Sequence, residues 1–232
     1  MHRAQRVLFV IIIAGSVIGC HDGPLYSMKT INPFFLREWA ADEKLGPTDF
    51  KRRKELQQLV VTMPRLPEAE QRQWLGQINA ILENDKNAEM RTLAIRALEG
   101  YGGEEAIVTC EKHLNDESPK VRMACCDVLG TKTTDRSYQI LAETIGSESN
   151  DDVQVAAIRA IGKHRSERAT QLLKEPLESR NPAIRFASVQ ALQSSTGKSL
   201  GDDPATWVAY LNGDPIEEKQ DGGFSSQLGR FF

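Results

Sequence analysis

The stretch from residue 118 to residue 129 reads SPKVRMACCDVL, and three similar stretches recur along the chain. They are NAEMRTLAIRAL at 87–98, NDDVQVAAIRAI at 150–161 and NPAIRFASVQAL at 181–192. Their starts lie 31, 32 and 31 residues apart, and each has apolar or small residues at its fourth, seventh, eighth, eleventh and twelfth positions. This spacing places those residues on one face of a helix. The sequence therefore predicts four copies of one amphipathic helix.

Signals for the start and the end of a helix flank these copies. Each copy begins with a residue whose side-chain oxygen is able to cap a helix: Asn87, Ser118, Asn150 and Asn181. Pro119 and Pro182 stand at the first helical position of two copies, where a missing N–H costs nothing. A glycine follows three copies, and we expect these residues to act as C-caps: Gly100, Gly130 and Gly162.

A second apolar stripe follows each of the first three copies at a spacing of four residues. It comprises Ala106, Cys110 and Leu114, then Ser137, Leu141 and Ile145, then Ala169, Leu173 and Leu177. Each repeat is therefore expected to be a helical hairpin, and one hairpin cannot bury its apolar face alone. We predict an all-α fold, an α-α superhelix of about four to five stacked hairpins, with the repeats over residues 84–212.

Both ends of the array have their own patterns. Residues 49–83 carry two helical stripes separated by Pro64 and Pro67, which predicts an atypical N-terminal capping hairpin. After the last copy, a loop rich in Gly and Asp leads to a short segment that contains Trp207. Residues 213–232 have the composition of a flexible tail. The tail ends in Phe231 and Phe232, which are either a docking peptide or simply a loose end.

The repeats resemble HEAT repeats, in the short form shared with phycobilin-lyase-type proteins. The resemblance rests on Asp85 with Met90-Arg91, on Asp116 with Val121-Arg122, and on Ile184-Arg185. In that family the aspartate and the arginine form a hydrogen-bonded ladder between neighbouring repeats. Gln154 replaces the arginine in the third repeat and Ser179 stands where the fourth would have its aspartate. The resemblance therefore implies a ladder that is incomplete at this point. The segment of Trp207 resembles the closing helix of bacterial HEAT lipoproteins.

The N-terminus has the pattern of an export signal. Arg3 and Arg6 precede a short apolar run over 7–18, and the run ends in Val17-Ile18-Gly19-Cys20. A membrane span needs about 20 apolar residues, and this run is shorter. The ending resembles the lipobox of bacterial lipoproteins, which implies a signal peptide over 1–19 and lipid attachment at Cys20. The alternative is an uncleaved anchor in which the cysteine is incidental.

Lipidation predicts where the protein is found. Two acyl chains hold a protein firmly on a bilayer, so we expect an exported protein anchored to a bacterial membrane through Cys20. His21 and Asp22 follow the cysteine, and they do not match the aspartate sorting rule, so the choice between inner and outer membrane stays open. Residues 20–48 are expected to be a tether with a short aromatic helix over 32–39, which either packs on the cap or faces a partner or the bilayer.

The charge balance argues against a nucleic-acid partner. The net charge of the chain is −3, and loss of residues 1–19 would leave 27 basic and 32 acidic residues. A basic surface of the kind that binds nucleic acid is therefore not expected. The basic run Lys51-Arg52-Arg53-Lys54 is interpreted as a solvated helix face rather than a binding patch.

The sequence offers no clear catalytic or metal site. Cys110, Cys125 and Cys126 occupy positions that other repeats fill with small or apolar residues, so we interpret them as packing residues. HEAT-type hydroxylases bind iron through His-Glu dipeptides, and in this chain neither His113 nor His164 is followed by Glu. We expect no enzyme activity, no cofactor and no metal.

The expected function is protein binding. An α-solenoid presents an extended surface, and such surfaces suit long or flexible partners. We therefore interpret the chain as a membrane-anchored scaffold or adaptor for envelope proteins whose identity the sequence does not give. Two alternatives remain: an enzyme or cofactor handler, lyase-like, built on a HEAT platform, and a structural envelope component that assembles with itself.

Overall fold

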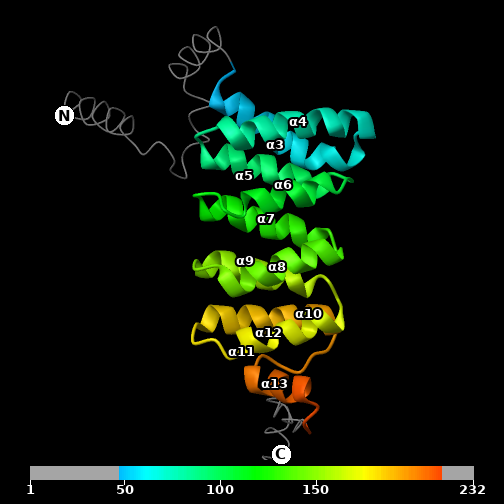
Figure 1. Ribbon diagram of the computed structural model, residues 1–232, viewed down its shortest axis with the longest axis vertical. Helices are drawn as coiled ribbons and strands as arrows, with labels where there is room; N and C mark the ends of the chain where they lie inside the picture. The colour runs from blue at the N-terminus through cyan, green and yellow to red at the C-terminus, as the bar shows by residue number, and fades with distance from the viewer. Residues whose placement is uncertain (1–46, 216–232) are drawn as a thin grey trace, which may run out of the picture. The chain divides into compact units, whose positions relative to one another are not determined.

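The computed structural model describes residues 47–215, and no strand occurs within them. The contacts divide the chain into residues 1–52 and 53–232. In the first part, residues 47–52 include the first turn of α3, where Arg52 donates to Asp49 at 3.2 Å. The second part holds the helical array (Figure 1).

The helices between residues 49 and 212 form five successive pairs (Figure 1). Their bounds are α3 (Asp49–Thr62), η3 (Met63–Arg65), α4 (Glu68–Asn84), α5 (Ala88–Ala97), η4 (Leu98–Gly100), α6 (Glu105–His113), α7 (Pro119–Thr131), α8 (Asp135–Ser147), α9 (Asp151–Gly162), α10 (Glu167–Leu172), α11 (Lys174–Leu177), α12 (Pro182–Thr196) and α13 (Pro204–Asn212). The all-α solenoid expected from the sequence is therefore confirmed.

The helix starts follow the expected caps at three of the four copies. Asn87 accepts a hydrogen bond from the backbone N–H of Glu89, Asn150 caps α9 and Asn181 caps α12. Ser118 is the exception, because its side chain makes no cap hydrogen bond. The Asp116 carboxylate instead accepts from the Ser118 backbone N–H at 2.8 Å. The prediction of a serine cap is therefore wrong at this copy, although the same backbone contact to an acidic residue two positions upstream is made at Asn87 and Asn150, where the caps do form.

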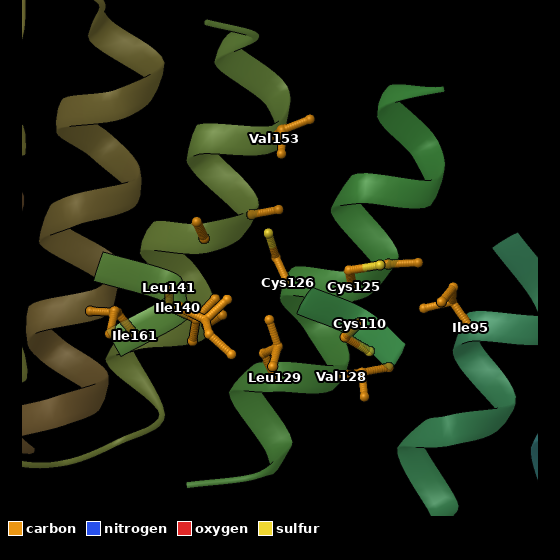
Figure 2. Packing of buried hydrophobic residues seen from close by; sticks show 14 of the residues in the cluster. Ile95, Cys110, Cys125, Cys126, Val128, Leu129, Ile140, Leu141, Val153 and Ile161 are labelled. Atoms are coloured by element: carbon orange, nitrogen blue, oxygen red, sulfur yellow. The ribbon is translucent and has the colours of Figure 1, made fainter. Parts of the chain in front are cut away.

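The predicted apolar stripes form the core between neighbouring pairs. The first helices of the pairs, α5, α7, α9 and α12, pack on one another in that order (Figure 1). We call the interface between two successive first helices a seam, and the second helix of each pair covers it. Figure 2 shows this packing around Leu129, Leu141 and Ile161, each of which is fully buried. Each pair therefore completes the apolar core of the next, as a quasi-linear array requires.

The glycines after the first helices have a different role from the one expected. Gly130 lies inside α7, Gly162 is the last residue of α9, and neither these two nor Gly100 has a positive φ angle. A Cβ atom on Gly130 would lie 2.8 Å from the Cα atom of Ala160, and one on Gly162 would lie 2.8 Å from that of Ala191. The C-cap prediction was wrong because these glycines permit close approach of the next repeat.

The second helix of the third repeat is broken into two. Pro176 has no N–H to donate, and its ring excludes the carbonyl four residues earlier, which belongs to Leu172. The helix α10 accordingly ends at Leu172, and α11 begins two residues later. The expected stripe survives the break, because Ala169, Leu173 and Leu177 are all buried.

Both ends of the array are closed by large buried side chains. At the N-terminal end, Met63 after α3 and Ile78 in α4 are fully buried. At the C-terminal end, Trp207 in α13 is fully buried and its indole N–H donates to the Gly201 carbonyl at 2.9 Å. The closing role expected for the Trp207 segment is therefore confirmed.

Candidate functional site

The predicted lipid-attachment residue lies outside the described residues. Cys20, the signal peptide over 1–19 and the aromatic segment of the tether belong to residues 1–46, and Phe231 and Phe232 belong to 216–232. These predictions therefore stay predictions. Within residues 47–215, no helix is long and apolar enough to cross a membrane.

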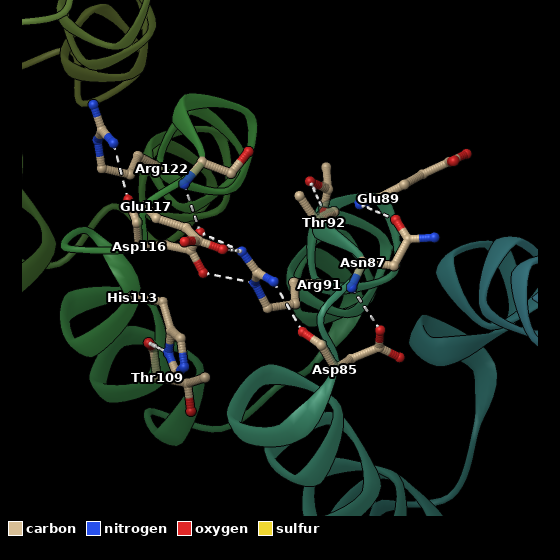
Figure 3. A network of polar contacts seen from close by, with 12 residues as sticks. Asp85, Asn87, Glu89, Arg91, Thr92, Thr109, His113, Asp116, Glu117 and Arg122 are labelled. Carbon is tan, nitrogen blue, oxygen red and sulfur yellow. Dashed lines mark hydrogen bonds and ion pairs between the residues drawn. The ribbon is translucent and has the colours of Figure 1, made fainter. Parts of the chain in front are cut away.

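The expected arginine ladder is present between the first two repeats (Figure 3). Arg91 in α5 donates through Nε and Nη2 to both oxygens of Asp116, at 2.8 and 2.9 Å, and through Nη1 to the Asp85 carbonyl at 2.9 Å. The side chains of Arg91 and Asp116 are only 6% and 7% exposed. A planar guanidinium matches a carboxylate in this two-point geometry, so the pair fixes the register of the two repeats.

The charge of Asp116 depends on its partners. Burial alone would raise the pKa of this carboxyl group, but hydrogen bonds from Arg91 and from the Ser118 N–H, together with the Arg91 charge, hold its pKa below the ordinary value. The pKa of Arg91 is raised, mainly by its hydrogen bond to Asp116. Glu117 also accepts from Arg91 at 3.1 Å, but its side chain is 84% exposed. Asp116 is therefore the principal partner.

The second step of the ladder uses a residue that the sequence reasoning did not identify. Arg122 in α7 donates to both oxygens of Glu148, at 2.9 and 3.1 Å, and to the Asp116 carbonyl at 2.9 Å. Glu148 stands five residues before Val153, as Asp116 stands five before Val121. The sequence thus contains an acidic residue at the same position in this repeat, but it is a glutamate and is missed when only aspartate is considered.

The ladder stops at the third step, as the sequence predicted. Gln154 in α9 donates to the Ile145 carbonyl at 2.7 Å, and the position of the next carboxylate is taken by Ser179. Ser179 accepts from the Asn181 backbone N–H at 3.2 Å. Arg185 in α12 donates to the carbonyl oxygens of Ser179 and Arg180. Within residues 47–215, no arginine–carboxylate pair therefore connects α9 to the start of α12 in the way that Arg91 and Arg122 connect the earlier repeats.

A cavity lies where the ladder is interrupted. Its volume is about 450 Å³, and Gln154 and Ser179 are both part of its wall. Glu175 and Glu178 also line it, and both are exposed. The remaining lining residues include four with aliphatic side chains, Ile145, Leu172, Pro176 and Ile184. The cavity thus combines an aliphatic wall with two carboxylates.

The three internal cysteines are packing residues, as predicted. Cys110, Cys125 and Cys126 are free and fully buried (Figure 2). Burial raises the pKa of the Cys126 thiol to about 12, with a further contribution from the charge of Asp127. Burial also raises the pKa of Cys125 well above its ordinary value. The thiolate forms of both residues are therefore disfavoured at neutral pH, as expected for packing residues.

The two histidines within 47–215 lie in different environments. His113 is buried at the end of α6, and its Nδ1 atom lies 2.8 Å from the Thr109 carbonyl oxygen (Figure 3). His164 lies in the turn after α9, where burial lowers its pKa. Among the described residues, no group of three or more His, Cys, Asp and Glu side chains is placed to hold a metal ion.

Exposed ion pairs connect the second helices of neighbouring repeats. Lys112 in α6 contacts Glu83 at 2.9 Å, Arg136 contacts Glu111 at 2.7 Å, and Arg168 contacts Asp135 at 3.6 Å. All six side chains are largely exposed, so each pair contributes little to stability. The second helices of successive pairs therefore present a row of charged, solvent-exposed side chains, which we call the second-helix row.

The basic run in α3 is only partly a solvated face. Lys51 and Lys54 are exposed, as expected, but the side chain of Arg53 is 20% exposed and pairs with Glu89 of α5 at 2.8 Å. Arg53 therefore helps to fix the capping hairpin against the first repeat.

The match to a family model agrees with this architecture. A family model for HEAT repeats matches residues 78–154 and 145–206, which together span more than half of the 232 residues. No curated protein matches the chain. Among solved structures, human deoxyhypusine hydroxylase in complex with glycerol is similar, with 22% sequence identity and a TM-score of 0.48. That match covers 53% of this chain and 44% of the hydroxylase, so the chain spans less than half of the hydroxylase's length.

Proposed function

Because the chain belongs to the HEAT-repeat family, we propose that it is a membrane-tethered scaffold that binds other proteins of the bacterial envelope. The observation that carries this proposal is the regular row of first helices. Arg96, Asp127, Arg159 and Gln190 occupy the same position in four successive repeats, and all four are exposed. Equivalent positions repeated along an array form an extended surface, which suits a partner that spans several repeats.

The composition of this surface also supports a protein partner. The row presents both signs of charge, and the exposed Phe186 lies on its last helix, α12. Protein interfaces combine apolar contacts with a polar rim, and aromatic side chains are frequent in them. Attachment of the array to a membrane rests on the lipobox-like residues that end at Cys20.

Site-specific crosslinking in cells tests the scaffold. A photoreactive amino acid is placed in turn at Asp127, Arg159 and Gln190 on the first-helix row, and at Glu111 on the second-helix row as a control. We expect the same foreign protein to be crosslinked from several successive first-helix positions. Crosslinks only to further copies of this chain would instead identify a self-assembling component, and no crosslink from either row would refute the scaffold.

Substitution of the predicted lipidated residue tests the tether. We expect Cys20→Ala to leave the chain unprocessed and to remove the lipid from the N-terminal peptide, as measured by mass spectrometry. His21→Ala is the matched control and should be processed normally. A Cys20→Ala chain that is still cleaved and still sediments with membranes would refute lipid anchoring at this residue.

A further inference from the structure

The cavity at the third seam occupies the place of a missing arginine. At the first two seams an arginine from one repeat reaches the carboxylate before the next, with Arg91 on Asp116 and Arg122 on Glu148. At the third seam both partners are replaced by shorter, uncharged residues, Gln154 and Ser179, and both line the cavity. The two substitutions thus put shorter side chains where the first two repeats have an arginine and a carboxylate, and the cavity lies against both of them.

The walls of the cavity match the two parts of an arginine side chain. Ile145, Leu172 and Pro176 offer apolar surface for the methylene stem. Glu175 and Glu178 offer carboxylates for the charged end, because hydrogen bonds from a guanidinium to a carboxylate are stronger than neutral ones. The volume of about 450 Å³ also lies within the range of about 300–1,000 Å³ that is typical of binding pockets.

The neighbouring basic residues already have acceptors of their own. Arg185 donates to the carbonyl oxygens of Ser179 and Arg180, and Lys174 donates to Asn212 at 2.6 Å. In the described structure, neither of these side chains pairs with Glu175 or Glu178. The two glutamates are thus exposed carboxylates on a cavity that has an apolar wall.

We propose that this cavity binds an arginine side chain of a partner protein, which completes the ladder from outside the chain. The inference rests on the proposed scaffold function and assigns it a specific anchoring point between α8 and α11, beside Gln154 of α9 and Ile184 of α12. A partner would present the arginine on an exposed, extended segment, because the cavity opens beside the short helix α11 rather than inside the core.

Calorimetric titration of the full-length protein in detergent micelles tests this assignment. The probe is N-acetyl-arginine amide, and N-acetyl-citrulline amide is its neutral control of nearly equal shape. We expect saturable binding of the arginine probe and binding of the citrulline probe weaker by about tenfold, which corresponds to about 1.4 kcal/mol. Equal affinity for the two probes would overturn the proposal.

Variants of the chain connect the binding to the cavity. Gln154→Arg with Ser179→Asp restores the intrachain ladder, fills the cavity and should abolish binding of the arginine probe. Glu175→Gln with Glu178→Gln keeps the cavity open and should weaken binding by about tenfold through the loss of charge-assisted hydrogen bonds. Glu143→Gln, at an exposed position on α8, is the control and should leave binding unchanged. Retained binding in the ladder-restoring variant would overturn the proposal.

Two further outcomes separate this inference from the scaffold itself. Crosslinks from the first-helix row that persist when the arginine probe does not bind would refute the inference and leave the scaffold intact. Probe binding without any crosslinked partner would refute the scaffold.

A third outcome concerns the occupant of the cavity. Binding that appears only in an Arg230→Gln variant would show that the chain's own tail occupies the cavity, and it would overturn assignment to a partner.

Discussion

At the scale of single residues, the buried pair of Arg91 and Asp116 carries the strongest polar contact between two repeats. Both side chains are almost fully removed from water, so the desolvation of each charge is offset only while the other is present. Removal of one partner leaves the other charge buried without full compensation. The resulting loss of stability is larger than the stability that the intact pair adds over two apolar residues in its place. The pair therefore determines register more than it adds net stability.

We predict that Asp116→Asn lowers the free energy of unfolding by about 3 kcal/mol, because it leaves the Arg91 guanidinium buried without its main counter-charge. The measurement is urea denaturation followed by circular dichroism. Glu117→Gln is the matched control, since Glu117 contacts the same arginine from an exposed position. Its effect should stay below about 1 kcal/mol. Equal losses in the two variants would contradict the role assigned to burial.

Acid should weaken the ladder. The pKa values of Asp116 and Glu148 are held below their ordinary values by arginine and backbone N–H donors that outweigh the effect of burial. A carboxyl group whose pKa is lower in the folded state stabilises the fold above its unfolded pKa, and this contribution is lost as the pH falls through the folded pKa. We therefore predict that stability falls as the pH drops below about 4.

The double variant Asp116→Asn, Glu148→Gln tests the origin of this acid sensitivity. Its unfolding midpoint in urea, measured between pH 7 and pH 3, should start lower than that of the natural chain and decline less steeply. Parallel curves for the two proteins would show that other carboxyl groups cause the acid sensitivity.

At the scale of elements, the close approach of first helices decides how the repeats stack. Gly130 at the end of α7 faces the backbone of Ala160 in α9, and Gly162 faces Ala191 in α12 in the same way. The two contacts lie one repeat apart, so the same kind of contact between small residues occurs at two successive seams. A side chain at either glycine would push the next first helix away.

We predict that Gly130→Ala destabilises the chain by about 1–3 kcal/mol, the usual cost of overpacking, although alanine favours a helix more than glycine does. A new Cβ atom would lie 2.8 Å from both the Cα and the Cβ atoms of Ala160. Gly76→Ala in α4 is the control, because nothing lies within 4 Å of its added Cβ, and it should stabilise by about 0.5–1 kcal/mol. Thermal unfolding of both variants distinguishes the two effects, and a stabilised Gly130→Ala variant would contradict this view.

At the scale of the whole array, the polar connections are unevenly distributed. The α5–α7 seam contains a buried arginine–carboxylate pair and the α7–α9 seam a partly buried one, whereas the α9–α12 seam has neither and is flanked by a cavity. In a linear array each repeat is stabilised mainly by its neighbours, so a weaker seam near one end favours local opening of that end.

We predict that backbone amides of α12 and α13 exchange with solvent faster than those of α7 and α9 under native conditions. The measurement is hydrogen exchange followed by mass spectrometry. The ladder-restoring variant Gln154→Arg, Ser179→Asp should slow exchange in α12 and α13 and leave α7 unchanged. Uniform exchange along the array, unaffected by this variant, would show that the seams have equal strength.

Most of the fold was predictable from the sequence because the same pattern of apolar and capping residues occurs four times. The apolar positions of the quoted stretches fix which helix face is buried, and a hairpin with one apolar face must stack on another. The interruption of the ladder at Gln154 and Ser179 was predictable for the same reason. An exception to a repeated pattern can be found by aligning the copies.

Contacts across the seams could be decided only by the tertiary structure. The sequence marks Gly130 and Gly162 as residues that end helices, but their role depends on how near the next backbone comes. It does not show that Glu148 reaches Arg122, nor that the shorter side chains of the third seam leave a cavity. Helix formation and face burial follow from neighbours within a few residues, whereas these features depend on distances between helices far apart in the chain.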